Sequence, residues 1–120
     1  MNRIEAYQWF WQSFDLNAYE ETTVPDDAQM PYITYQVQMS EFETTMYNTA
    51  SLWYKGTSWS AVTQKSMEIY DAIGYGGVVL HCDEGAFWIK RGTPFAQRMS
   101  DPDTLVRRIY LNVEVENFVE

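Results

Sequence analysis

Residues 105–116 read LVRRIYLNVEVE, and this run decides the fold class. Apolar and polar residues alternate along it, which is the pattern of a β-strand with one face buried against a core. One face is expected to carry Leu105, Arg107, Ile109, Leu111, Val113 and Val115, and the other Val106, Arg108, Tyr110, Asn112, Glu114 and Glu116. A strand of this length needs neighbours, so the run predicts a sheet.

The segment before this strand predicts a β-hairpin followed by a loop. Val78–Cys82 is an apolar run, Asp83–Gly85 supplies turn residues, and Ala86–Arg91 is a second apolar run. From Gly92 to Asp103 the chain contains two prolines among polar residues, and we expect an ordered loop there.

Two stretches show helical periodicity. The first spans residues 2–14, with Asn2 as a cap and Glu5 completing a capping box. Its expected apolar stripe is Ile4, Tyr7, Trp11 and Phe14, flanked by Phe10. The second is capped by Thr57 or Ser58 and runs to Ile73, with Gly74 ending it. Its expected inner stripe is Trp59, Val62, Ser66, Ile69, Tyr70 and Ile73.

Two strands are expected between the helices. After a short strand near Asn17–Thr23 and a turn at Val24–Ala28, Tyr32–Met39 alternates, with Ile33, Tyr35, Val37 and Met39 on one face. A connection at Glu41–Thr44 leads to a second strand, Thr45–Lys55, and together they predict a long β-hairpin from Tyr32 to Lys55. Its outward uncharged polar residues favour contact with a neighbour, although a solvated hairpin is the simpler interpretation.

The predicted architecture is therefore one domain, residues 1–120, of the α+β class. We expect a mostly antiparallel sheet with a long β-hairpin and two helices packed on one face. The chain is 17% aromatic, which exceeds what a small core needs, so the rings either fill an aromatic core or lie in part in protein–protein contacts.

Charge excludes an ordinary nucleic-acid-binding protein. The net charge is −9, and residues 1–54 carry eight acidic residues but one basic residue, Arg3. Phosphate binding needs Lys and Arg, so the acidic excess serves solubility or a wall that repels DNA. We expect no signal peptide and no membrane span, and hence an intracellular soluble product.

Catalytic and metal-binding motifs are missing from the sequence. His81 is the one histidine and Cys82 the one cysteine, and as strand neighbours they point to opposite faces. The chain contains no phosphate-binding glycine motif and no zinc-protease motif. We therefore expect no enzyme, no cofactor and no metal.

A basic cluster interrupts the acidic chain. The cluster consists of Lys90, Arg91, Arg98, Arg107 and Arg108. These residues either pair with acids on the same face or form a patch that meets an acidic neighbour head to tail in a ring.

Three segments carry a resemblance to a known family. They are MPYITYQV (30–37), SWSAVTQKSMEIYDAIG (58–74) and FWIKRGTPFAQRMSDPDTLVRRIYLNVEVENF (87–118). In their order and residue types they resemble the tail-terminator proteins of long flexible-tailed phages, also labelled minor capsid or tail-completion proteins. The most specific parts are the strand led by Pro31 and the Pro94 loop that feeds the terminal strand.

The resemblance implies a ring-forming subunit, with six copies capping the tail tube, stopping its polymerisation and presenting a surface to the head connector. Expected partners are further copies of the chain, the major tail tube protein, the head-completion or connector protein, and double-stranded DNA that passes through without specific binding. The expected location is the tail–neck junction of the virion, after synthesis in the host cytoplasm. Expected contact residues are Tyr32, Tyr35, Glu41, Glu43, Tyr47, Trp53, Arg91, Arg98, Arg107 and Arg108.

Two other functions remain open. A head-completion or neck adaptor protein on the portal side would share the size, the ring and the lack of catalytic groups. A small peptide- or ligand-binding module would use the aromatic residues and a free strand edge.

Overall fold

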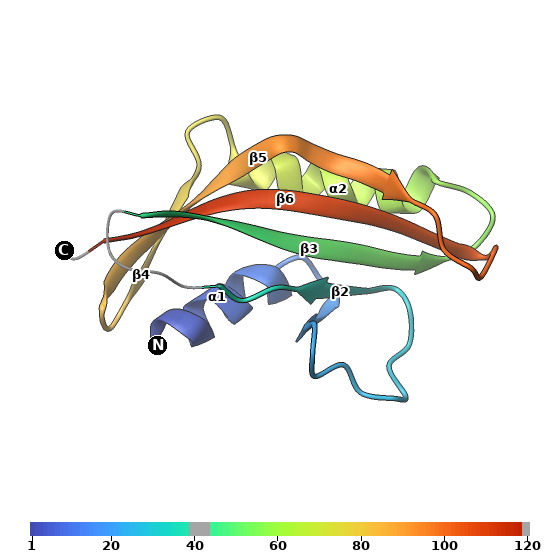
Figure 1. Ribbon diagram of the computed structural model, residues 1–120, viewed down its shortest axis with the longest axis horizontal. Coiled ribbons are helices and arrows are strands. Elements are labelled where there is room, and N and C mark those ends of the chain that lie inside the picture. The colour runs from blue at the N-terminus through green and yellow to red at the C-terminus, as the bar shows by residue number, and fades with distance from the viewer. Residues whose placement is uncertain (39–43, 119–120) are drawn as a thin grey trace.

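The computed structural model describes residues 1–38 and 44–118 and shows an α+β fold. Two helices accompany a curled six-stranded sheet with the strand order β1-β2-β3-β6-β5-β4, which is mostly antiparallel (Figure 1). The elements are α1 (Arg3–Gln12), β1 (Asn17–Glu20), β2 (Tyr32–Tyr35), β3 (Thr45–Lys55), α2 (Ser60–Ile73), β4 (Val78–Cys82), β5 (Gly85–Met99) and β6 (Val106–Phe118). The fold class is as expected from the sequence.

Strand β6 lies at the centre of the sheet, between β3 and β5. Its residues from Ile109 to Val115 alternate as predicted, with the odd-numbered side chains buried. The prediction is wrong at the beginning of the strand, where Val106 is buried and Leu105 is exposed and precedes the strand. The reason is a turn in which the Val106 amide donates to the Asp103 carbonyl, so regular alternation begins only after it.

The loop expected from Gly92 to Asp103 is mostly strand. β5 continues to Met99, and its pairing with β6 shifts register between Arg91 and Ala96. The shift accommodates Pro94, which has no amide hydrogen to donate to the ladder. At this place Asn112 Nδ2 donates to the Pro94 carbonyl at 2.9 Å, so a side chain of β6 satisfies this acceptor where the ladder is interrupted.

The first two strands differ from expectation in length and direction. β2 ends at Tyr35, and β1 pairs with it in parallel. β2 and β3 are antiparallel, but in the described residues they pair at four positions only, from Tyr32↔Trp53 to Tyr35↔Ala50. The expected long hairpin from Tyr32 to Lys55 is therefore not paired along its whole length. The expected connection at Glu41–Glu43 and the strand residue Met39 lie outside the described residues.

Helix α1 packs its aromatic residues onto the sheet. Its capping box is formed as predicted, with Asn2 Oδ1 accepting from the Glu5 amide at 2.8 Å and Glu5 Oε1 accepting from the Asn2 amide at 3.0 Å. The ring of Tyr7 lies against Tyr35 and Phe87, which belong to β2 and β5. Because Ala6, Tyr7, Phe10 and Trp11 define the buried stripe, the stripe turns away from Ile4, which is 56% exposed; its predicted burial is wrong.

Helix α2 packs on the same side of the sheet. It begins at Ser60 rather than directly after Ser58, although Ser58 Oγ still accepts from the Ser60 amide, and it ends at Gly74, whose φ is 76°. Its buried side chains are Val62, Ser66, Ile69 and Ile73, whereas Trp59 is half-buried and Tyr70 is exposed. Lys65 Nζ donates to the Phe14 carbonyl at 2.9 Å and so joins α2 to the chain just after α1.

The two helices thus cover one face of the sheet, and Figure 1 looks onto the other face, with α2 behind β5 and β6. Neither α1 nor α2 is long and apolar enough to cross a membrane, and no other helix occurs in the described residues.

Candidate functional site: the uncovered face of the sheet

The uncovered face carries a row of aromatic rings across four strands. In register, Tyr32 lies opposite Trp53, and Trp53 lies opposite Arg108. The ring centres of Tyr19 and Tyr32 are 5.8 Å apart, and those of Tyr32 and Trp53 are 6.4 Å apart. Tyr110 continues the row on β6, with its ring centre 5.5 Å from the guanidinium carbon of Arg108. The sequence pattern placed Tyr32 and Trp53 in a contact surface, and the structure brings them together with Arg108.

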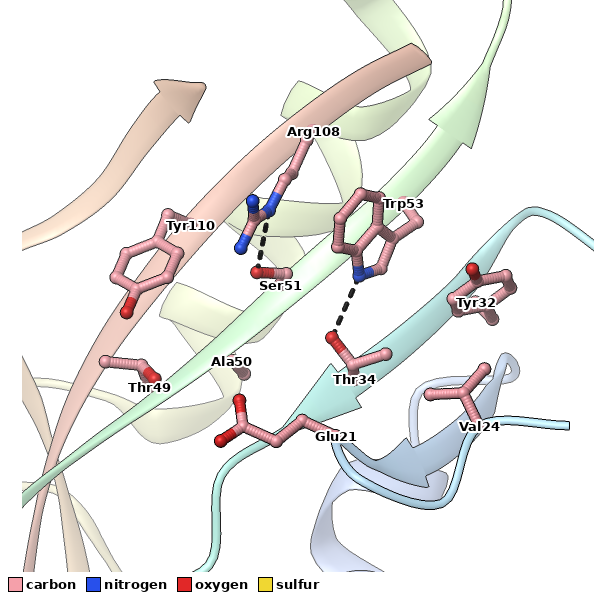
Figure 2. Close-up of a pocket in the computed structure, with 10 residues that line it drawn as sticks. All are labelled: Glu21, Val24, Tyr32, Thr34, Thr49, Ala50, Ser51, Trp53, Arg108 and Tyr110. Atoms are coloured by element: carbon pink, nitrogen blue, oxygen red, sulfur yellow. Dashed lines mark hydrogen bonds between the residues drawn. The ribbon is translucent and has the colours of Figure 1, made fainter. Parts of the chain in front are cut away.

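A groove of about 230 Å³ is open along this row (Figure 2). We refer to it as the Arg108 groove. Trp53 Nε1 donates to Thr34 Oγ1 at 2.8 Å, which fixes the indole across β2 and β3. Arg108 Nε donates to Ser51 Oγ at 3.1 Å, which fixes the guanidinium across β3 and β6. The lining residues are Glu21, Val24, Tyr32, Thr34, Thr49, Ala50, Ser51, Trp53, Arg108 and Tyr110.

The guanidinium of Arg108 keeps unused hydrogen-bonding capacity. Its carbon lies 4.4 Å from the Trp53 ring centre, in a cation–π contact. Among residues 1–38 and 44–118, the bond to Ser51 is its one hydrogen bond, and no carboxylate lies within 4 Å of it, although Glu21 lines the same groove. The two Nη groups can therefore donate hydrogen bonds to a carboxylate from outside the subunit.

Arg107 is a structural residue. Its Nη1 donates to the carbonyls of Thr104 and Val106 at 2.7 and 3.1 Å, and its Nη2 donates to the carbonyl of Thr57 at 3.2 Å. These bonds tie the beginning of β6 to the segment before α2. The structure thus places Arg107 and Arg108, which are adjacent in sequence, in two different roles.

The other basic residues also lie on rings. Arg91 Nε donates to the Tyr70 carbonyl at 2.9 Å, where a cation at the last turn of α2 is favourable for the helix dipole. Arg98 lies over Trp59 and Lys90 over Trp88. None of the five cations forms an ion pair with an acid in the described part of the chain, so the pairing expected as the simpler interpretation is not observed there.

The remaining candidate residues are scattered. Tyr35 is 3% exposed in the core beneath the helices, so its side chain is not available for a subunit contact in this fold. Tyr47 is 71% exposed on the uncovered side of β3, two residues before the groove residue Thr49, but it does not itself line the groove. Glu41 and Glu43 lie outside the described residues. Sequence reasoning missed Tyr110, although it alternates with Arg108, and Tyr19, whose place depends on the parallel pairing of β1.

Tyrosines packed in the helix-covered core have raised pKa values. Burial raises the pKa of Tyr7, and burial together with the charge of Glu20 raises the pKa of Tyr35. Burial also raises the pKa of Tyr54, with Lys65 lowering it in part and Glu68 adding to the rise. None of these tyrosines lines the Arg108 groove. The described residues contain no cluster of three or more His, Cys, Asp or Glu side chains that could hold a metal ion.

Comparison with known proteins found no matching family model, no matching curated protein and no matching solved structure.

Proposed function

We propose that this chain is a structural subunit that assembles into a ring, which has six copies by the family resemblance and caps the tail tube of a long flexible-tailed phage. The ring stops polymerisation of the tube and provides the surface that joins the tail to the head. Three segments of the sequence, residues 30–37, 58–74 and 87–118, support this proposal by their resemblance to tail terminators.

The observation that carries the proposal is the uncovered sheet face. In the described part of the chain, this face has no helix layer and carries the aromatic rings of Tyr32, Trp53 and Tyr110. We expect that another protein molecule covers these rings on association. Aromatic residues and arginine are the types enriched in protein–protein contacts, whereas a catalytic site needs paired titratable groups. The groove presents the guanidinium of Arg108, which lies against aromatic rings. This arrangement suits recognition of a carboxylate on another protein.

The charge of the chain fits a ring through which DNA passes. At a net charge of −9 a phosphate backbone is repelled rather than held, so DNA slides without specific binding. The proposed partners are copies of the chain, the major tail tube protein and the head-completion or connector protein, and the proposed location is the tail–neck junction of the virion. A neck adaptor on the portal side is the second candidate, because an aromatic contact face would serve it equally.

Electron microscopy of lysates from a phage with a stop codon in this gene tests the proposal. Overlong or uneven tails beside filled heads without tails are expected, because an uncapped tube continues to polymerise. Tails of normal length that fail to join heads would contradict tail termination and favour the portal-side adaptor. Normal virions would contradict both candidates.

A further inference from the structure

We infer that the uncovered sheet face of one copy receives the outer face of α2 from the next copy, with Asp71 of that copy paired to Arg108. The inference rests on the proposed ring and adds the subunit contact to it. It names the occupant of the Arg108 groove, which is a helix of a second copy of this chain.

The outer face of α2 carries apolar residues that no part of the described chain covers. Met67 is 59% exposed, and Tyr75, directly after the helix, is fully exposed. Met67 lies on the side of the helix away from the buried stripe of Val62, Ser66, Ile69 and Ile73. An amphipathic helix normally presents charged residues outward, so an exposed methionine and tyrosine beside the helix's acids indicate a contact surface.

The two surfaces lie on opposite sides of the subunit. α2 packs on the covered face of the sheet, and its outer residues point away from that face, whereas the Arg108 groove opens on the other face. A contact between two different surfaces of identical subunits repeats head to tail, and it closes into a ring when the rotation allows. A ring is what the proposed function requires, and a contact between two copies of the same face would give a dimer instead.

The charges of the two surfaces are complementary. Asp71 is exposed on the outer face of α2, and no described cation lies within ion-pair distance of it. Arg108 has no carboxylate partner within residues 1–38 and 44–118, and its two Nη groups form no hydrogen bond there. Gln64 lies two turns before Asp71 on the same side of the helix and can donate to Glu21 on the opposite wall of the groove. The helix would thus offer an acceptor to the cation and a donor to the acid.

Disulfide cross-linking between two variants tests this contact directly. Both carry Cys82→Ser, which removes the one native thiol; one adds Asp71→Cys on α2, and the other adds Thr49→Cys in the groove. The mixture is oxidised as purified protein and in phage particles produced by complementation of the stop-codon phage. A cross-linked heterodimer between the two variants is the expected product in at least one preparation.

Matched controls separate a specific contact from random collision. In the control, Gln12→Cys replaces Asp71→Cys; Gln12 is exposed on α1, away from both surfaces. Because this position lies outside the proposed contact, we expect no more than about a tenth of the cross-linked product. Equal cross-linking from the α1 position, or none from the α2 position in both preparations, would overturn the inference. A cross-link from the groove to a different phage protein, with none between copies, would also overturn it.

Charge exchange gives a second readout of the same pair. Arg108→Glu and Asp71→Arg are each expected to weaken association by about tenfold or more, and the double variant is expected to recover most of it. Recovery supports the pairing, and a double variant no better than either single variant contradicts it. Because cross-linking reports contact between copies and the stop-codon phage reports tail length, failure of the contact is distinguishable from failure of the proposed function.

Discussion

The guanidinium carbon of Arg108 lies 4.4 Å from the ring centre of Trp53, on the face of the sheet that neither helix covers. The contact holds a cation in place while leaving its Nη groups free of carboxylates from the described chain. The neighbouring Arg107 instead uses both of its Nη groups to donate to backbone carbonyls of its own chain. Arg107 thus ties the beginning of β6 to its own chain, whereas the Nη groups of Arg108 can donate to another molecule.

Single alanine substitutions at these arginines are expected to differ in stability. Arg107→Ala removes three hydrogen bonds from a charged donor to carbonyls and should lower the free energy of unfolding by about 1–3 kcal/mol. Arg108→Ala removes one bond and the contact with Trp53, and should cost about 1 kcal/mol or less. Urea unfolding of the isolated subunit measures both, and equal losses would contradict the separation of roles. A simultaneous change of both residues would mix the two effects.

Gly92 is expected to be intolerant of a side chain because β5 passes close to β6 there. A Cβ at Gly92 would lie 2.7 Å from the Asn112 carbonyl oxygen, a backbone atom that cannot move without shifting the strand. Gly92→Ala should therefore lower the free energy of unfolding by about 1–3 kcal/mol. Gly76→Ala is the matched control, since a Cβ there meets no atom within 4 Å, and a change within about 0.5 kcal/mol is expected. If thermal unfolding shows a larger loss of stability for Gly76→Ala than for Gly92→Ala, the close approach of the two strands at Gly92 is refuted.

Alkaline pH is expected to destabilise the fold. Burial raises the pKa of Tyr7 above its usual 10, so above that pH the unfolded chain loses this proton while the folded chain keeps it. Stability is therefore full below pH 10 and falls as the pH rises further, by up to about 1.4 kcal/mol per pH unit from Tyr7. Tyr7→Phe should reduce this slope, and at neutral pH it should change stability by about 1 kcal/mol or less, because the hydroxyl lacks a well-formed hydrogen bond. Unfolding measured from pH 7 to 11 with an unchanged slope would contradict this origin.

Local sequence signals predicted much of the framework. The capping box at Asn2, the end of α2 at Gly74 and the bounds Thr45–Lys55 of β3 depend on residues close in sequence, and all are confirmed. The alternation of buried and exposed residues in β6 could be predicted because one face of the strand packs against the core along most of its length.

The parts that failed depend on distant partners. The parallel pairing of β1 with β2 is a contact that no local pattern encodes. Pro94 indicated a loop, yet β5 continues past it to Met99, and the Asn112 side chain on another strand donates to the Pro94 carbonyl. The same limit applies to the candidate site, since Tyr32, Trp53 and Arg108 were expected at contacts, but their common groove arises only when three strands align.

The distribution of tail lengths, measured by electron microscopy after complementation of the stop-codon phage, tests the central claim most directly. The wild-type chain and Lys55→Glu, whose lysine is exposed outside the Arg108 groove and is not among the expected contact residues, should restore tails of uniform length. Arg108→Glu, shown to be folded by its unfolding curve, should leave tails overlong or uneven. Uniform tails with Arg108→Glu would contradict the claim that the uncovered face assembles the ring that ends the tail.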